Sequence, residues 1–258
     1  MEIFTPLKNP LPGNLTDKDF EEIAKQLRLK ILDITFNPGG HVSSCFSAVE
    51  IFTAIYFGGV VRYKSEEPHW QDRDRVILSK GHAAPGFYAV LSRAGFFPES
   101  DMDKFRMMDT GFHGHPVQDA VPGVEFTSGS LGQGLSFGLG LALAGQLSRQ
   151  DYRVYVIMGD GECQEGQVWE AAMAAAHYHA DHLIAIVDHN KYQQTGPIER
   201  ELSFSPFKEK WQSFGWNVIE ADGHDTVDII QSLKKANQNA SKPTAEPVRA
   251  LAPNMKGS

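Results

Sequence analysis

The sequence predicts a doubly wound α/β fold, in which a mainly parallel sheet carries helices on both faces. Two short apolar runs at 153–158 and 183–187 flank an alanine-rich, helix-like segment at 165–179. Because apolar strands joined by a crossover helix are typical of parallel sheets buried on both faces, this stretch predicts a βαβ unit. With 258 residues, the chain has enough material for one large domain with its own core.

Before this unit, apolar positions three or four residues apart predict an amphipathic helix that follows Thr16 and ends at the turn 37–40. These positions are Phe20, Ile23, Leu27, Ile31 and Ile34. The pattern further along predicts helices at 47–57, 83–94 and 98–107, a strand at 76–78 and an irregular, charged connection at 62–74.

A segment rich in glycine and proline at 108–128 is much longer than an ordinary connection, which is typical of a binding loop. It leads into a helix of small residues, SFGLGLALAGQL, that suits close packing against a sheet. A strand at 217–221 and a helix at 225–237 extend the alternation. We expect a single domain over 1–258, with an extended arm at 1–16 and a short tail at 242–258.

Charge and cysteine content restrict the partners. The chain has 24 Lys and Arg against 32 Asp and Glu, a net charge of -8, which argues against nucleic-acid binding. Only two cysteines occur, Cys45 and Cys163, so we expect a reducing compartment, the cytoplasm. The amino terminus lacks the apolar run of a signal peptide, and no stretch approaches the roughly 20 apolar residues of a membrane-spanning helix.

Polar residues follow both strands of the βαβ unit, at the edge where open parallel sheets bind ligands. Gly159-Asp160-Gly161 ends the first strand, and Asn190 follows the second after 28 further residues. Carboxylate and amide oxygens at neighbouring strand ends suit one hard divalent cation. The glycines let the backbone approach a ligand and leave N–H groups for phosphate oxygens. Each motif alone is more often an ordinary turn or cap, whereas the pair at two strand ends is specific.

Four segments make the chain resemble transketolases. GDGECQEGQVWEAAMAAAHYH precedes LIAIVDHNKYQQTGP, and together they resemble the thiamine diphosphate-binding motif of that family. Upstream, SKGHAAPGFYAVL and GVEFTSGSLGQGLSFGLGLALA are similar to two further transketolase segments. The resemblance runs from about Leu27 to about Gly223 and is closest to the amino-terminal half, which in some organisms is a separate subunit.

The resemblance implies thiamine diphosphate and Mg²⁺ as cofactors, with Ca²⁺ or Mn²⁺ as substitutes for the metal. It makes Asp160, Asn190 and the main-chain carbonyl of Tyr192 the metal ligands. The cofactor-binding residues that it implies are His82, Ser130, Leu131, Gly132, Gly159, Asp160, Gly161, Glu162, Asn190 and Gln194. Leu131 would support the cofactor ring, whereas Gln194 stands where many relatives carry an apolar residue.

Three histidines in loops rich in glycine and proline match functional histidines of the family and are our catalytic candidates: His41, His82 and His115. An imidazole can donate to a phosphate or exchange a proton with a carbonyl oxygen near neutral pH. Without the resemblance, each histidine is more often a structural residue. Glu165, the fourth candidate, matches a carboxylate buried between two cofactor sites of a dimer, although an ordinary acid in a first helical turn is an equally good interpretation.

The resemblance also implies a partner subunit. In transketolases the carboxylate that activates the aminopyrimidine ring, and most groups that hold the sugar phosphate, belong to a second, pyrimidine-binding domain. We therefore expect a separate carboxy-terminal transketolase-like subunit in a two-plus-two heterotetramer. The pair would transfer a two-carbon ketol unit between sugar phosphates, and the isolated chain would be inactive.

Two other interpretations stay open at this stage. The alpha subunit of a 2-oxo acid dehydrogenase shares the GDG motif and the downstream asparagine, although the SKGHA, GHP and SLGQG segments favour a transketolase. A noncatalytic scaffold subunit with the same fold would explain a tail, SKPTAEPVRALAPNMKGS, that departs from the family pattern. Binding of thiamine diphosphate with Mg²⁺ would separate a scaffold from an enzyme.

Overall fold

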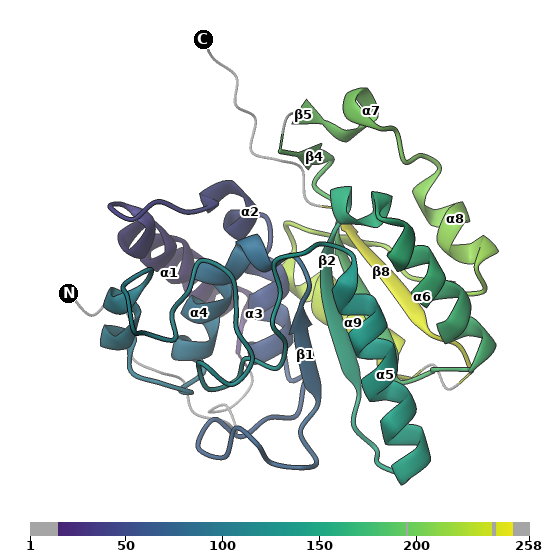
Figure 1. Cartoon of the computed structure of the whole chain (residues 1–258), viewed down its shortest axis with the longest axis horizontal. Helices are drawn as coiled ribbons and strands as arrows, with labels where there is room; N and C mark the ends of the chain where they lie inside the picture. Colours follow the sequence, from purple (N-terminus) through teal and green to yellow (C-terminus); the bar gives the residue numbers. More distant parts are fainter. Residues whose placement is uncertain (1–14, 195, 239–240, 250–258) are drawn as a thin grey trace.

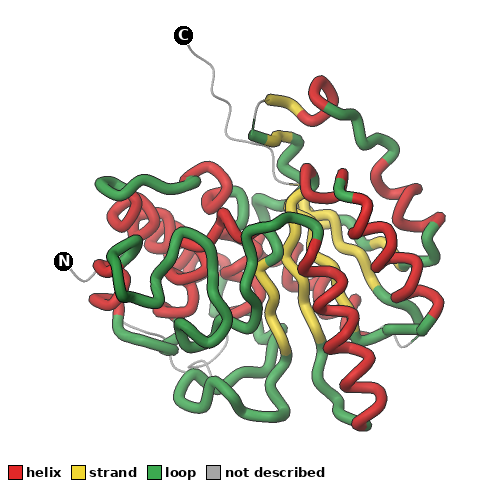
Figure 2. The backbone as a smooth tube through the Cα atoms, viewed as in Figure 1, coloured by secondary structure: helices red, strands yellow, loops and turns green. Residues whose placement is uncertain are grey.

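A computed structural model of the chain describes residues 15–194, 196–238 and 241–249. Its main sheet lies between two helical layers, as Figures 1 and 2 show. The sheet has the order β1 (Arg75–Leu78), β2 (Val154–Gly159), β3 (Leu183–Asp188), β8 (Thr244–Arg249) and β6 (Asn217–Val218), and β7 (Ala221–Asp222) also pairs with β8. Every pairing in this sheet is parallel, which confirms the predicted fold class.

The two faces of the sheet carry different helices. One face packs against α1 (Asp17–Thr35), α3 (Val49–Phe57), α4 (Ala84–Arg93) and α9 (Thr226–Gln238). The other packs against α5 (Gln133–Ser148), α6 (Gly166–His177) and α8 (Phe207–Ser213). Side chains of β2 alternate between the two cores, because successive residues of a strand point to opposite faces: Tyr155 lies in the first core and Val156 in the second.

Short elements connect these layers. On the amino-terminal side they are α2 (Val42–Phe46) and the 3-10 helices η1 (Gly81–Ala83) and η2 (Glu99–Lys104). After the sheet's central strands come the 3-10 helix η3 (Gly161–Gln164), the hairpin of β4 (Tyr192–Gln193) and β5 (Gly196–Pro197), and α7 (Ile198–Glu201). Among the described residues, no helix combines the length and the apolar character that crossing a membrane requires.

The local predictions in the first half of the chain agree with the structure in most places. All five apolar positions predicted for the first helix are buried in α1, and Thr16 forms a capping box with Asp19. The helix predicted at 47–57 begins at Val49 and is preceded by the unpredicted α2. At 98–107 the structure has the shorter 3-10 helix η2 instead, and Arg106 beyond it has a left-handed φ of 59°.

The carboxy-terminal part differs from the expectation of a tail at 242–258. Residues 244–249 form β8, an inner strand between β3 and β6, whereas 250–258, like 1–14 of the expected arm, lie outside the described residues. The predicted strand 217–221 is divided, because β6 pairs with Thr244 and Ala245 whereas β7 pairs with Val248 and Arg249. Pro247 lies opposite this interruption and has no N–H to donate to a neighbouring strand.

Candidate functional site

The candidate site lies at the carboxyl ends of β1, β2 and β3. The register pairs Leu78 with Ile157 and Gly159 with Asp188, so the three strands end side by side. The N–H of Asp160 donates to the carbonyl of Asp188 at 3.2 Å. The loops that carry GDG and the downstream asparagine therefore begin from one point of the sheet.

Asp160 is buried against the loop that follows β3. Its carboxylate accepts hydrogen bonds from the N–H of Lys191 at 2.7 Å and from the N–H of Gly161 at 2.8 Å. Burial raises the pKa of Asp160 to about 7, although both hydrogen bonds act in the opposite direction. A cation at this carboxylate would favour its charged form and offset the cost of burial.

Asn190 lies on the same loop and is held at both ends of its carboxamide. Its Oδ1 accepts from the N–H of Tyr192 at 2.9 Å, and its Nδ2 donates to Oδ2 of Asp188 at 3.2 Å. The described residues contain no cluster of three or more His, Cys, Asp or Glu side chains that would hold a metal. The ligands that the family resemblance implies, the carboxylate of Asp160, the amide oxygen of Asn190 and the main-chain carbonyl of Tyr192, would make a hard-oxygen donor set, which suits Mg²⁺ completed by phosphate and water.

A buried ion pair lies next to the loop that follows β3 and carries Asn190. Lys80, at the end of β1, pairs with Oδ2 of Asp188, and these side chains are 1% and 0% exposed. Ser47 Oγ donates to the same oxygen at 2.5 Å. Within the described part of the chain, three buried oxygens of this region have no hydrogen-bond partner: Asp188 Oδ1, Ser44 Oγ and Ser128 Oγ. Such orphaned oxygens are expected beside a site that binds a polar ligand.

Glu162 joins the surrounding loops. Its Oε1 accepts from Ser79 Oγ and from the N–H of Gly132 at 2.8 Å, and its Oε2 accepts from the N–H of Gly159 at 3.1 Å. Burial raises the pKa of Glu162, whereas these donors lower it. The side chain is 2% exposed, so the structure shows Glu162 bound to protein donors and turned away from solvent.

The glycines of the site have two distinct functions. Gly132 precedes α5 with a φ of 81°, a conformation that side-chain-bearing residues rarely adopt. Gly81 permits close approach, because a Cβ there would lie 2.5 Å from Ser128 Oγ. The N–H groups of Gly159 and Gly161, expected to face phosphate, donate to the side chains of Glu162 and Asp160 in this structure.

The structure brings the three predicted histidines together. The rings of His41 and His82 lie 5.6 Å apart between centroids, and the ring of His115 lies beside Gly129. Burial, with the nearby charge of Lys80, lowers the pKa of His82 to about 3. Burial also lowers the pKa of His115, and both shifts include a contribution from His41. His82 is therefore a neutral imidazole at neutral pH, which can donate one proton and accept another.

The other predicted residues lie at the exposed rim. Ser130 is exposed and Leu131 is half-buried in the turn before α5, whereas Tyr192 and Gln194 are exposed beyond β3. Glu165 is exposed at the start of α6, and its Cβ lies where a side chain at Gly132 would collide with it. The single chain therefore does not bury Glu165.

Sequence reasoning missed Ser47, Ser79, Lys80 and Asp188. Lys80 is part of SKGHA and Asp188 precedes His189-Asn190, yet nothing in the pattern marks a charge at a strand end as buried. Their pairing joins residues 108 positions apart, which no local motif reveals.

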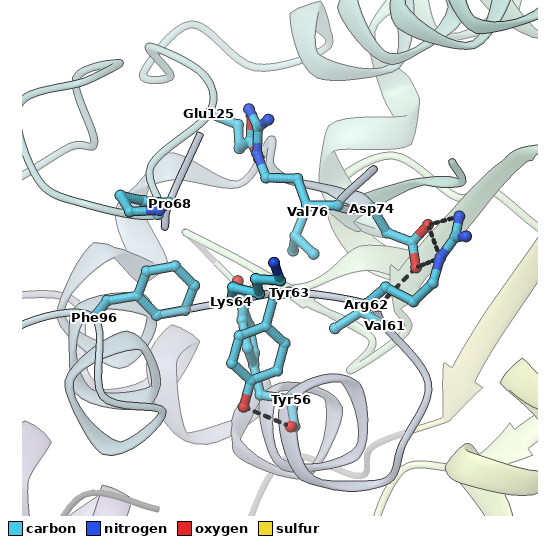
Figure 3. A pocket seen from close by; sticks show the side chains of 12 residues that line it. Tyr56, Val61, Arg62, Tyr63, Lys64, Pro68, Asp74, Val76, Phe96 and Glu125 are labelled. Carbon is cyan, nitrogen blue, oxygen red and sulfur yellow. Dashed lines mark hydrogen bonds and ion pairs between the residues drawn. The ribbon is translucent and has the colours of Figure 1, made fainter. Parts of the chain in front are cut away.

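A separate pocket lies at the other end of β1 (Figure 3). Its walls include Tyr56, Tyr63 and Phe96, and the ion pair of Arg73 with Glu125 lies at its margin. Asp74, just before β1, accepts from the N–H of Arg62 at 2.8 Å beside it. Because this pocket is at the amino end of the strand, it is not part of the site formed by Asp160 and Asn190.

Comparison with known proteins identifies the relatives of this chain. Residues 20–253 match the family model described as transketolase, thiamine diphosphate binding domain. The 6-deoxy-6-sulfo-D-fructose transketolase subunit SqwG of Clostridium sp. (strain MSTE9) is 40% identical over 205 residues, 80% of this chain and 74% of that protein. An apulose-4-phosphate transketolase subunit from Actinobacillus succinogenes is 40% identical over 88% of this chain and 83% of its own length.

Solved structures show the same likeness. Transketolase from Pichia stipitis in complex with sedoheptulose 7-phosphate is 30% identical, with a TM-score of 0.84 over 91% of this chain and 36% of that one. Transketolase from Campylobacter jejuni is 26% identical, with a TM-score of 0.85 over 92% of this chain and 38% of that one. The chain thus spans little more than a third of these full-length proteins, but about three quarters or more of the two subunit-type relatives.

Proposed function

The chain belongs to the transketolase family, and from this premise we propose that it is the diphosphate-binding subunit of a transketolase whose pyrimidine-binding part is a separate polypeptide. The observation that carries the proposal is the arrangement at the ends of β2 and β3. There the carboxylate of Asp160, just after β2, and the carboxamide oxygen of Asn190, just after β3, accept hydrogen bonds from successive main-chain N–H groups, those of Lys191 and Tyr192.

In this proposal Asp160, Asn190 and the carbonyl of Tyr192 hold Mg²⁺, for which Ca²⁺ or Mn²⁺ can substitute. The metal neutralises diphosphate without a cluster of basic residues, which agrees with the net charge of -8. Orphaned buried oxygens of Ser44 and Ser128 support a polar ligand here. When bound, thiamine diphosphate supplies the carbanion chemistry, and the protein binds and orients it.

The histidines provide proton donors and acceptors on the open side of the site. Because burial lowers the pKa of His82 to about 3, its neutral ring can donate a hydrogen bond to a phosphate or carbonyl oxygen without carrying a charge. His41 and His115 are both exposed and lie next to it. We propose that these two rings face the sugar substrate and exchange protons with its oxygens.

The proposed substrates are sugar phosphates or similarly acidic sugars. The names of two relatives specify 6-deoxy-6-sulfo-D-fructose and apulose 4-phosphate, and each of these sugars carries an anionic group. Which sugars serve as ketol donor and ketol acceptor depends on the partner subunit, because most groups that hold the sugar phosphate would belong to it.

A two-plus-two heterotetramer is the assembly that we propose. Helix α5 has no charged residue between Gln133 and Ser148, although part of its surface is open to solvent. Leu147 on this helix and Met173 on the neighbouring α6 are exposed. A helix that is uncharged all round is usually covered, which supports packing of this face in an assembly.

Two buried, unpaired cysteines support a cytoplasmic location.

Calorimetry with thiamine diphosphate and Mg²⁺, on the chain together with a carboxy-terminal transketolase-like partner subunit, tests the proposal. We expect metal-dependent binding that Asp160→Ala abolishes, whereas Asp181→Ala, at the opposite end of β3, leaves it unchanged. The complex, and neither polypeptide by itself, should transfer ketol units from a ketose phosphate to an aldose. Absence of cofactor binding by the complex would favour a scaffold, and reaction with a 2-oxo acid would favour the dehydrogenase type.

A further inference from the structure

The ion pair of Lys80 with Asp188 is an unusual feature of the site because it is wholly buried. Its partners come from the ends of β1 and β3, with β2 between them. Removing two charges from water costs more than an average ion pair returns, so a buried pair is weak evidence for a stabilising role. Its geometry suggests another role, since Asp188 also contacts the candidate metal ligand Asn190.

Oδ2 of Asp188 is the point where several donors meet. It accepts from the ammonium of Lys80, from Ser47 Oγ and from Nδ2 of Asn190. Lys80 also donates to the carbonyl of Ser44 at 3.3 Å, which fixes the ammonium between α2 and the sheet. Lys80 and Ser47 therefore hold the carboxylate of Asp188 while it accepts a hydrogen bond from the amide of Asn190.

This contact determines which end of the carboxamide faces the metal position. The two ends of an amide have nearly the same shape, but only the oxygen binds a hard cation. A carboxylate can only accept, so Asp188 selects Nδ2 of Asn190, and the N–H of Tyr192 can only donate, so it selects Oδ1. A rotated amide would lose both hydrogen bonds and place its NH₂ group where Oδ1 now lies.

We propose that Asp188, held by Lys80 and Ser47, is a positioning residue that fixes the carboxamide of Asn190 with its oxygen toward the metal. The inference rests on the proposed function and deepens it, because it explains a buried charge pair by the orientation of a ligand. Lys80 supplies the charge that compensates Asp188, and neither residue touches the metal.

Two double variants separate the hydrogen bond from the charge. Lys80→Met with Asp188→Asn removes both charges and keeps an acceptor oxygen where Oδ2 now lies. Lys80→Met with Asp188→Leu removes the charges and the acceptor together. The probe is Mn²⁺, titrated by calorimetry into the two-subunit complex at saturating thiamine diphosphate, and thermal melting checks that each variant is folded.

We expect the Asn variant to bind Mn²⁺ within about threefold of wild type and the Leu variant to lose about 10- to 100-fold, as is usual when a metal ligand loses its orienting partner. Lys80→Met with Asp188→Ala, which removes the acceptor without adding volume, replaces the Leu variant if that variant does not fold.

A rescue distinguishes orientation from general damage. Asn190→Asp provides two equivalent oxygens, so it should recover Mn²⁺ affinity in the Leu background, where orientation is lost. In the wild-type background it should weaken binding, because a second carboxylate would then lie against Asp188.

Wild-type affinity in the Leu variant, equal losses in the Asn and Leu variants, or failure of the rescue would each overturn the inference while leaving the proposed function intact. Absence of Mn²⁺ binding by the wild-type complex would overturn the proposed function itself, and this inference with it.

Discussion

The carboxylate of Glu162 accepts a hydrogen bond of 2.8 Å from the N–H of Gly132, the residue that precedes α5. The same oxygen accepts from Ser79 after β1, and the other oxygen accepts from Gly159 at the end of β2. One buried side chain thus joins three loops of the site, and the orientation of the turn before α5 depends on it.

Substitution of Glu162 by Gln should destabilise the protein. An amide has one acceptor oxygen where the carboxylate has two, so at least one buried N–H loses its partner, at a cost of about 1–3 kcal/mol. Urea unfolding measures the change in the free energy of unfolding. Glu165→Gln is the matched control, because Glu165 is exposed and should change this free energy by less than about 0.5 kcal/mol. Equal effects of the two substitutions would show that the buried hydrogen bonds of Glu162 do not stabilise the protein.

Glu246 should make the stability of the protein fall as the pH rises. Its side chain is fully buried in β8, and neither carboxylate oxygen has a partner within the described residues. Burial, with the nearby charge of Asp228, raises the pKa of Glu246 well above its ordinary value of 4.5. The folded state therefore holds the proton more tightly than the unfolded state, so the stability is fully present below about pH 4.5 and is lost as the pH approaches the raised pKa.

Urea unfolding between pH 5 and 8 measures this dependence. Glu246→Gln cannot titrate, so its stability curve should be flatter than that of wild type. Glu246→Ile should add about 1–3 kcal/mol at pH 8, because an apolar side chain replaces a buried carboxyl group without a hydrogen-bond partner among the described residues. Glu66→Gln, at an exposed position, should keep the wild-type slope. The same slope in Glu246→Gln would show that another group causes it.

His82 should stay neutral between pH 8 and pH 5. Burial, together with the charge of Lys80, lowers the pKa of its imidazole to about 3. In a titration followed by NMR, the ring resonances that disappear in His82→Gln should therefore not move between pH 8 and 5. A titration midpoint of the His82 ring near the ordinary pKa of about 6.5 would show that the ring is not in the buried surroundings described here.

Leu147→Glu should weaken assembly without weakening the fold. The side chain is 87% exposed on the uncharged helix α5, so a charge there leaves the core of the single chain intact. A charge placed inside an interface between subunits would be buried without a partner. We expect at least a tenfold weaker association in sedimentation experiments and an unchanged melting temperature of the isolated chain. Unchanged association would place α5 outside the interface.

The sequence by itself determined the parts of the fold that follow from local patterns. Helical spacing of apolar residues located α1, and two apolar runs located β2 and β3 with the helix between them. Because parallel neighbours end at the same edge, this was enough to bring Asp160 and Asn190 to one place. The family motifs predicted that His41, His82 and His115 belong to one site, because each motif is a short continuous segment, and the structure places the three rings near one another.

Tertiary structure alone decided which distant segments meet. Strand β8 lies between β3 and β6 although its sequence, with a glutamate and a proline, does not have the apolar pattern of an inner strand. The pairing of Lys80 with Asp188 and the inward turn of Glu162 also depend on contacts between separate loops. Apolar periodicity reports only which face of one element is buried. The order of strands and the partners of buried charges are set by how all the elements pack, so these features could be seen only in the folded chain.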